Sequence, residues 1–535
     1  MTLTRFRISV LTFLTALTLA LGLAAAPAAA TTTVTAFKQA VAESASRDKA
    51  LSEFYKRRDY APIWTSRSDS ARRRAFLQAL DKAGDHGLPT DRYDKDYLAG
   101  LFRDARSQRD IGRVEVEASR LFLRYAQDIQ SGVLSPASVD DGIKRRPPRR
   151  DRLAQLEAFA KSSPRAYLKS LVPSSPEYTR LMAEKMRLER LLGRGGWGPE
   201  VPGGKLEPGD SGPRVVALRN RLITMGYMKR SAAQSYDAEM QKAVQVFQSE
   251  HGLNTDGVAG PATLEQINIP VEKRLEQVIV AMERERWLGP DRGKRHVLVN
   301  ITDFHARLVE NGKVVFKTRS VVGMNVHDRR TPEFSDEMDH MVINPTWNVP
   351  RSIAVKEYLP ELQKNPNAVS HLRLIDARGR IVRRDGMDFT QYDARNFPFD
   401  MKQPPSRGNA LGRVKFMFPN RHNIYLHDTP AKHLFAREVR AYSHGCIRLN
   451  DPFDFAYQLL GNQVSDPVAF FKAKLDTGVE TRVDLKYPLP VHIIYRTALS
   501  SPKGRMEYRR DVYGRDARIF DALSAAGVVL RAVQS

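Results

Sequence analysis

The stretch HVLVNITDFHARLVENGKVVFKTRSVVG, residues 296–323, decides what kind of fold the second half of the chain adopts. Apolar and polar residues alternate along it, as they do in strands that bury one face. Asn311-Gly312 interrupts the alternation where a two-residue turn would join two antiparallel strands. The stretch therefore predicts a β-hairpin, and with it a β-rich domain that we place at residues 275–500.

Two further strand-like segments lie on either side of a different kind of sequence. MVINPTWNVP (341–350) and VKFMFPNRHNIYLHDTP (414–430) continue the sheet pattern. Residues 351–406 between them are charged, and we expect them to be helical and to lie over the sheet domain as an inserted lid. They lead into QPPSRG (403–408), which has the composition of a hinge. Residues 501–535 are expected to form a C-terminal extension.

The region before the sheet domain is predicted to be mostly helical from residue 35 to residue 195. EVEASRLFLRYAQDIQSG (115–132) has apolar residues at helical spacing, and Gly132 is placed to end the helix. The face that we expect to be buried comprises Ala118, Leu121, Phe122, Tyr125 and Ile129. A linker dense in Gly and Pro, RGGWGPEVPGG (194–204), follows. The chain is thus predicted to be a multidomain α+β protein with a helical N-terminal scaffold.

Residues 206–269 are predicted to form a separate three-helix unit. PRVVALRNRLITMGY (213–227) and DAEMQKAVQVFQSEHGL (237–253) each place their apolar residues on one helical face. TDGVAGPATLEQI (255–267) gives a turn and a short third helix, with Pro261 suited to its first turn. In these motifs the unit resembles the three-helix type of peptidoglycan-binding domain.

The N-terminus and the charge of the chain bear on where it works. Arg5 and Arg7, an apolar run from 8 to 23 and Ala28-Ala29-Ala30 are typical of a signal peptide over residues 1–30, with an uncleaved inner-membrane anchor as the alternative. The net charge is +24, but the basic residues are spread along the chain. Outside the cytoplasm such a charge favours anionic polymers such as cell-wall glycans as partners. The even spread argues against tight nucleic-acid binding, and diffuse solubilising charge is the alternative.

The chain has one cysteine, Cys446, in AYSHGCIRLND (441–451). It cannot form an internal disulfide, so we interpret it as a free reactive thiol. His427 ends a predicted strand and His444 lies two residues before the thiol, so both are candidate bases that would stabilise a thiolate. Gly445 allows a sharp turn beside the sulfur, where main-chain N–H groups could stabilise an oxyanion.

Two alternatives to a nucleophile stand beside this interpretation. Cys446 could be a buried spacer with structural histidines around it. His427, His444 and Cys446 could instead bind zinc, although no H-E-x-x-H or paired C-x-x-C motif accompanies them. We expect no metal site and no cofactor.

HDTP (427–430) followed by SHGCIRL (443–449) resembles the motif of L,D-transpeptidases with a YkuD-type catalytic domain, and further blocks resemble the YcbB-like subgroup. The resemblance implies that Cys446 is the nucleophile and His427 the proton donor and acceptor. It also implies that Ser443, His444 and Gly445 line the site and that Arg448 binds substrate. The general family often has Asn at position 448 and Gly at position 428, where this chain has Arg448 and Asp428.

The same resemblance implies a periplasmic enzyme that acts on peptidoglycan stem peptides and glycan, and that carbapenems acylate. It would release a terminal D-alanine and crosslink the third residues of two stems, with cell-wall synthesis proteins as possible partners. Tyr425, Arg440 and Arg448 are candidates for holding stem carboxylates. The alternatives are a transferase that attaches an outer-membrane protein to peptidoglycan, and a wall-binding scaffold with an idle site.

Overall fold

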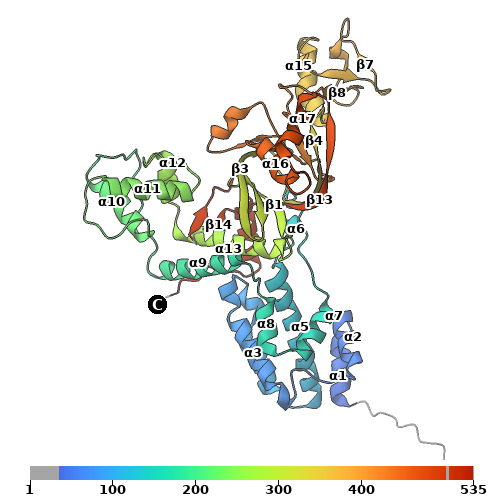
Figure 1. Ribbon diagram of the computed structural model, residues 1–535. Coiled ribbons are helices and arrows are strands. Elements are labelled where there is room, and N and C mark those ends of the chain that lie inside the picture. The colour runs from blue at the N-terminus through green and yellow to red at the C-terminus, as the bar shows by residue number, and fades with distance from the viewer. Residues whose placement is uncertain (1–34, 502–504, 534–535) are drawn as a thin grey trace, which may run out of the picture.

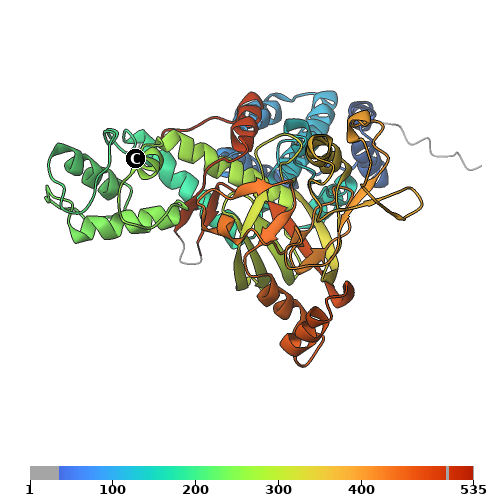
Figure 2. The ribbon, with the colours of Figure 1, turned by 90° about the horizontal axis from the view of Figure 1, so that it is seen from above.

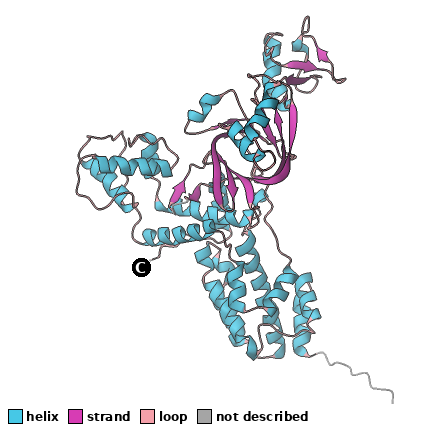
Figure 3. Ribbon diagram, viewed as in Figure 1, coloured by secondary structure: helices cyan, strands magenta, loops and turns pink. Residues whose placement is uncertain are grey.

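The computed structural model describes residues 35–501 and 505–533, so the expected signal peptide lies outside the described residues. A helical bundle, a three-helix unit and a strongly curved sheet surround two long central helices (Figures 1 and 3). The view from above separates the three-helix unit from the sheet (Figure 2). Among residues 35–501 and 505–533, no helix combines the length and the apolar character needed to cross a bilayer.

The helical bundle occupies residues 36–171 and has an aromatic core. Trp64, Phe76, Phe122 and Phe159 are fully buried and their rings contact one another. The apolar face predicted for residues 115–132 is buried, and the helix ends at Gly132, as expected. Gly132 has φ 91°, a backbone conformation that favours glycine. Its helices are α1 (Ala36–Ala45), α2 (Lys49–Arg57), α3 (Ser70–Asp81), α4 (Lys95–Asp104), α5 (Gln108–Ser131), α6 (Pro136–Val139), α7 (Arg152–Lys161) and α8 (Pro164–Leu171).

Two long helices, α9 (Pro176–Gly193) and α13 (Val271–Leu288), pack against each other at the centre of the molecule (Figure 1). Their core also includes residues of the hairpin β14 (Ala498–Ser500) and β15 (Met506–Tyr508) and of α18 (Arg515–Ala525). The expected C-terminal extension is therefore part of a central core. The sequence did not indicate this because the segments that form the core are far apart in the chain.

The three-helix unit forms as the sequence predicts. It consists of α10 (Pro213–Thr224), α11 (Ala238–Glu250) and α12 (Pro261–Ile267), with Pro261 in the first turn of α12. The expected apolar faces are buried in a core of their own, formed around Leu218, Leu222, Val244 and Phe247.

The main sheet has nine strands in the order β11-β3-β12-β10-β9-β4-β13-β1-β2. Strand β2 also pairs with β3, so the sheet curls back on itself. The predicted hairpin joins β2 and β3, with Asn311 at φ 48° and Gly312 at φ 78° in its turn. The strands are β1 (Arg295–Asn300), β2 (His305–Glu310), β3 (Lys313–Gly323), β4 (Phe334–Ile343), β9 (Val414–Met417), β10 (Leu426–His427), β11 (Ala441–Ser443), β12 (Ile447–Leu449) and β13 (Thr481–Ile494). Helices α16 (Pro452–Leu460) and α17 (Pro467–Asp476) pack on the sheet core.

The inserted segment differs from the helical structure that we expected. It contains α14 (Arg351–Ile353), a π-helical turn at Ala354–Tyr358 and α15 (Leu359–Lys364), but also a four-stranded sheet in the order β5-β8-β6-β7. These strands are two to four residues long, too short for an alternating pattern to be recognised. They are β5 (Trp347–Asn348), β6 (Arg373–Ile375), β7 (Ile381–Val382) and β8 (Asp400–Gln403). The segment has its own hydrophobic core and projects from the end of the main sheet (Figure 1).

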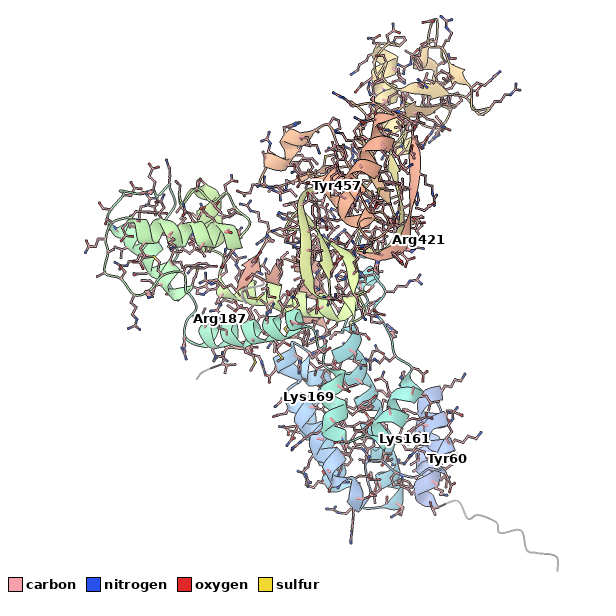
Figure 4. The ribbon with its side chains drawn as sticks, viewed as in Figure 1. Tyr60, Lys161, Lys169, Arg187, Arg421 and Tyr457 are labelled. Carbon is pink, nitrogen blue, oxygen red and sulfur yellow. The ribbon has the colours of Figure 1, made fainter. Side chains whose placement is uncertain are left out.

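The basic side chains are spread over the molecule, as the sequence indicates. Figure 4 shows Lys161 and Lys169 on the bundle, Arg187 on α9 and Arg421 on the sheet domain, and all four residues are exposed. Tyr457, also labelled there, lies on α16 and packs against the sheet core.

Candidate functional site

Three neighbouring strands place a row of polar side chains on one face of the main sheet. Lys415 on β9 is paired with His427 on β10, and His427 is paired with Arg448 on β12. Directly paired residues point to the same face of a sheet. Lys415, His427 and Arg448 therefore lie side by side, while their neighbours Phe416, Leu426 and Ile447 are buried in the core.

The hydrogen bond of the His427 ring sets its tautomer. Nδ1 lies 2.5 Å from the main-chain oxygen of Asp428, which can only accept, so Nδ1 carries the proton and Nε2 keeps its lone pair. Burial and the charge of Arg448 lower the pKa of His427 to about 3. The imidazole is therefore neutral in the free protein.

Asp428, where the general family often has glycine, holds the loop beside His427. Its carboxylate accepts hydrogen bonds from the main-chain N–H groups of Arg413 and Thr429 and from Lys432. A side chain at Gly412 would collide with Asp428 at 2.3 Å, and Gly412 has φ 63°. Asp428 in this position therefore requires a residue without a side chain at position 412.

The Cys446 thiol is uncharged in the free protein, which corrects our expectation of a stabilised thiolate. Burial raises its pKa to about 11, and this outweighs the hydrogen bonds from Tyr425 and the charges of Arg448 and Lys415, which act in the opposite direction. The thiol donates to the main-chain oxygen of Asn423 at 3.4 Å. The resting pair is therefore a neutral thiol and a neutral imidazole.

The loop before the cysteine is fixed by a small hydrogen-bond network. Ser443 Oγ donates to the main-chain oxygen of Cys446 at 2.5 Å and accepts from the N–H of Gly445 at 3.2 Å. Thr331 donates to the oxygen of Gly445, which has φ 115°, a conformation that favours glycine. The N–H of Gly445 is thus occupied. In the described chain the N–H groups of His444 and Cys446 donate to no main-chain acceptor, so they are the better candidates for an oxyanion site.

His444 is bound by the inserted segment. Its Nε2 lies 2.7 Å from Oε1 of Glu357, in the π-helical turn, and the same carboxylate oxygen lies 2.7 Å from Nη2 of Arg329. Since its ring is engaged in this way, His444 is a weaker candidate for the base than His427.

These residues line one cavity of about 650 Å³. Of the predicted site residues, Cys446, His427, His444, Ser443, Tyr425 and Arg448 line it. The inserted segment, which we expected to lie over the sheet domain as a lid, contributes one wall. Sequence reasoning named none of its residues in the site, and it missed Lys415. Only the register of β9 against β10 reveals that Lys415 belongs to the site. The residues not anticipated from the sequence are Asp328, Arg329, Trp347, Asn348, Val349, Pro350, Ser352, Ile353, Lys356, Glu357, Tyr358, Ala410, Leu411, Lys415, His422, Asn423 and Ile424.

Arg440 does not join this cavity, in contrast to our expectation. Its guanidinium donates to the main-chain oxygens of Ser320, Arg437 and Phe304, and it stacks over the ring of Phe304. Strand β11 lies between Arg440 and the loop of the thiol, so closeness in sequence does not bring Arg440 into the cavity.

Metal binding finds no support in the arrangement. Within the described residues, no group of three or more His, Cys, Asp or Glu side chains is arranged to hold a metal ion. His427 and His444 instead use ring nitrogens for Asp428 and Glu357.

Comparison with known proteins identifies the domains. A profile of the L,D-transpeptidase catalytic domain matches residues 294–484. The matched residues include Cys446 and His427 of the cavity described above. Profiles described as "Putative peptidoglycan binding domain" and "Scaffold domain" match residues 211–267 and 49–184. The chain thus combines a helical scaffold, a peptidoglycan-binding domain and a β-rich L,D-transpeptidase catalytic domain.

Individual relatives match parts of the chain. The protein described as "Putative L,D-transpeptidase" from Haemophilus influenzae is 30% identical over 229 residues, which cover 42% of this chain and 45% of that protein. "N-acetylmuramoyl-L-alanine amidase CwlL" of Bacillus licheniformis is 43% identical over 60 residues, 11% of this chain and 17% of that protein. The chain therefore spans less than half the length of these relatives. The crystal structure of an L,D-transpeptidase (Yku) from Stackebrandtia nassauensis aligns at 15% identity over 56% of this chain and 97% of that chain, with a TM-score of 0.22.

Proposed function

We propose that the protein is an L,D-transpeptidase that crosslinks the third residues of two peptidoglycan stem peptides. The observation that carries the proposal is the placement of Cys446 and His427 in one cavity of a domain of this family. A thiol nucleophile, a neutral imidazole and free N–H groups in the cysteine loop are the groups that acyl transfer requires.

In the proposed reaction, Cys446 attacks the carbonyl carbon of the third residue of a tetrapeptide stem. The thiol proton passes to Nε2 of His427 as the sulfur–carbon bond forms, since the resting thiol is not ionised. The N–H groups of His444 and Cys446 stabilise the oxyanion. The peptide bond then breaks, His427 gives its proton to the leaving amine, and D-alanine departs.

The second half of the reaction reverses these roles. The side-chain amine of a diamino acid on another stem loses a proton to His427 and attacks the thioester. The carbon–sulfur bond breaks, and Cys446 regains its proton from His427. The product is a crosslink between the third residues of two stems.

The other domains place this chemistry at the cell wall. The peptidoglycan-binding domain would hold the enzyme on its polymeric substrate, and we assign the protein to the periplasm on this basis. The scaffold bundle supports the catalytic domain through α6 and the segment after it, where the main-chain N–H of Lys144 donates to the oxygen of Glu333 on the loop before β4.

The test is to mix the mature protein with a tetrapeptide donor and follow the intact mass. An adduct on Cys446 that has lost D-alanine, followed by a dimer when an acceptor stem is added, is the expected result. A carbapenem should give a stable adduct on the same residue. Transfer to a protein amine but not to a stem would favour the transferase that attaches a protein to peptidoglycan. If neither the tetrapeptide nor the carbapenem gives an adduct, the protein is instead a wall-binding scaffold with an idle site.

A further inference from the structure

Four cationic side chains line the cavity around Cys446 in the described chain, and two of them are neutralised by carboxylates. Arg329 lies 2.7 Å from Glu357, and Lys356 lies 2.7 Å from Asp328. Glu357 and Asp328 are also the acidic side chains that line this cavity. The carboxylates of the wall are therefore already paired.

The other two cations, Lys415 and Arg448, have no such partner. Neither side chain makes an ion pair or hydrogen bond within the part of the chain that the structure describes, and Nε of Arg448 is buried without an acceptor. Burial lowers the pKa of both groups. Among acidic side chains, Glu480 has the largest effect on the pKa of Lys415, and it acts through space while its carboxylate accepts the N–H of Thr346. Partly burying a cation costs desolvation free energy, which a bound anion can offset.

The two unpaired cations lie on either side of His427. Each is the directly paired residue on a neighbouring strand, so each is about 5 Å away in the direction across the sheet. Both charges also act on the Cys446 thiol. An anion bound between them would lie close to the imidazole and to the sulfur.

Resting on the function proposed above, we infer that Lys415, acting with Arg448, binds the terminal carboxylate of the donor stem and makes the enzyme select donors that end one residue after the scissile bond. His427 must reach the leaving nitrogen. In a terminal residue the carboxylate carbon is two bonds from that nitrogen, so the carboxylate lies just beyond the imidazole, where these cations are. A longer stem would place a neutral amide there and leave both cations unpaired.

The rival explanation is that Lys415 only supports the developing charge on sulfur and oxygen. The two explanations differ in what they predict for a donor without a terminal carboxylate. A carboxylate-binding lysine affects the acid donor much more than its amide, whereas general electrostatic support affects both donors equally.

The experiment compares acylation of the full-length mature protein by a tetrapeptide donor and by its C-terminal carboxamide. The variants are Lys415→Met, Lys415→Arg and, as a matched control in the same cavity, Lys356→Met, whose ammonium is already paired. The wild type should prefer the free acid on the order of ten- to a hundred-fold, the usual effect of a hydrogen-bonded charge pair. Lys415→Met should reduce this preference to a few-fold, and Lys415→Arg should retain most of it. Lys356→Met should leave it unchanged.

Alkylation of Cys446 by the neutral reagent iodoacetamide reports whether each variant keeps an intact site. An unchanged acid-to-amide preference in Lys415→Met overturns the inference, and so do equal losses for the two donors. If the wild type acylates with neither donor, the proposed function fails instead, and the two failures are thereby distinguished.

Discussion

Nε2 of His444 lies 2.7 Å from Oε1 of Glu357, which joins the loop of the reactive cysteine to the inserted segment. Because the contact holds one wall of the cavity in place, we expect Glu357→Gln to loosen residues 351–406 as a unit. Hydrogen exchange over that segment should become faster, while β9 stays protected. Stem-peptide donors should be used less well, with little change in reaction with iodoacetamide.

Glu361→Gln is the matched control, since Glu361 is exposed on the same segment. Should the segment exchange as slowly as β9 in both Glu357→Gln and the wild type, it is a fixed part of the domain and does not act as a lid.

Replacing the proposed nucleophile, Cys446, should abolish turnover without unfolding the domain. Cys446→Ser keeps the size of the side chain, but a hydroxyl is a far weaker acid and a poorer nucleophile than a thiol. We expect no adduct by intact mass and no crosslinked product, with a far-ultraviolet circular dichroism spectrum like that of the wild type. Crosslinking by the serine variant would exclude the cysteine mechanism.

The two histidines should differ in their effect on acylation. His427→Ala removes the Nε2 base and should slow acylation on the order of a hundred-fold or more. His444→Ala should have a smaller effect, because its ring is engaged with Glu357. A severe loss in the His444 variant alone would reverse the assignment of the base.

The pH dependence of thiol alkylation should reveal the neutral resting pair. Because burial raises the pKa of Cys446 to about 11, the thiolate fraction, and with it the iodoacetamide rate, should rise about tenfold per pH unit from pH 7 toward that value. His427 has a pKa of about 3, so it stays neutral above about pH 4 and should add no step between pH 5 and 7. A plateau below pH 8 would indicate a preformed thiolate–imidazolium pair.

Deleting residues 206–269 should weaken retention on isolated cell walls while leaving the reaction of Cys446 with iodoacetamide intact. The residues around the thiol lie outside this segment, although His251 stacks on Tyr508 and Arg510 pairs with Glu265 across the boundary. Wall sedimentation of both proteins measures the effect. Equal retention would remove the wall-binding role from this domain.

The parts of the fold and site that depend on local pattern could be predicted from the sequence. The turn at Asn311-Gly312 and the apolar face of α5 follow from residue types and spacing. The placement of His427 and Cys446 in one cavity follows from a strand end and a short loop. These features depend only on the residue types and their spacing within short segments of the sequence.

Features that depend on strand register, burial or packing between distant segments could not be predicted from the sequence pattern. Lys415 belongs to the site only because β9 pairs with β10 in one register. Arg440 turns away although it is six residues from Cys446. The high pKa of the thiol comes from its burial, which no motif reports.

Helix α13 has one further consequence for how the enzyme would work on a polymer. It follows the wall-binding unit directly, is buried over most of its length and is tied to the catalytic domain by ion pairs of Arg284 with Glu333 and Asp516. Its 18 residues make a rod of about 27 Å, in place of a flexible tether. A rigid helix fixes the distance between the glycan that the peptidoglycan-binding domain binds and the stem peptide that acylates Cys446. Crosslinks should therefore form at a regular distance from each bound glycan, whereas a flexible linker would allow a wide range of distances.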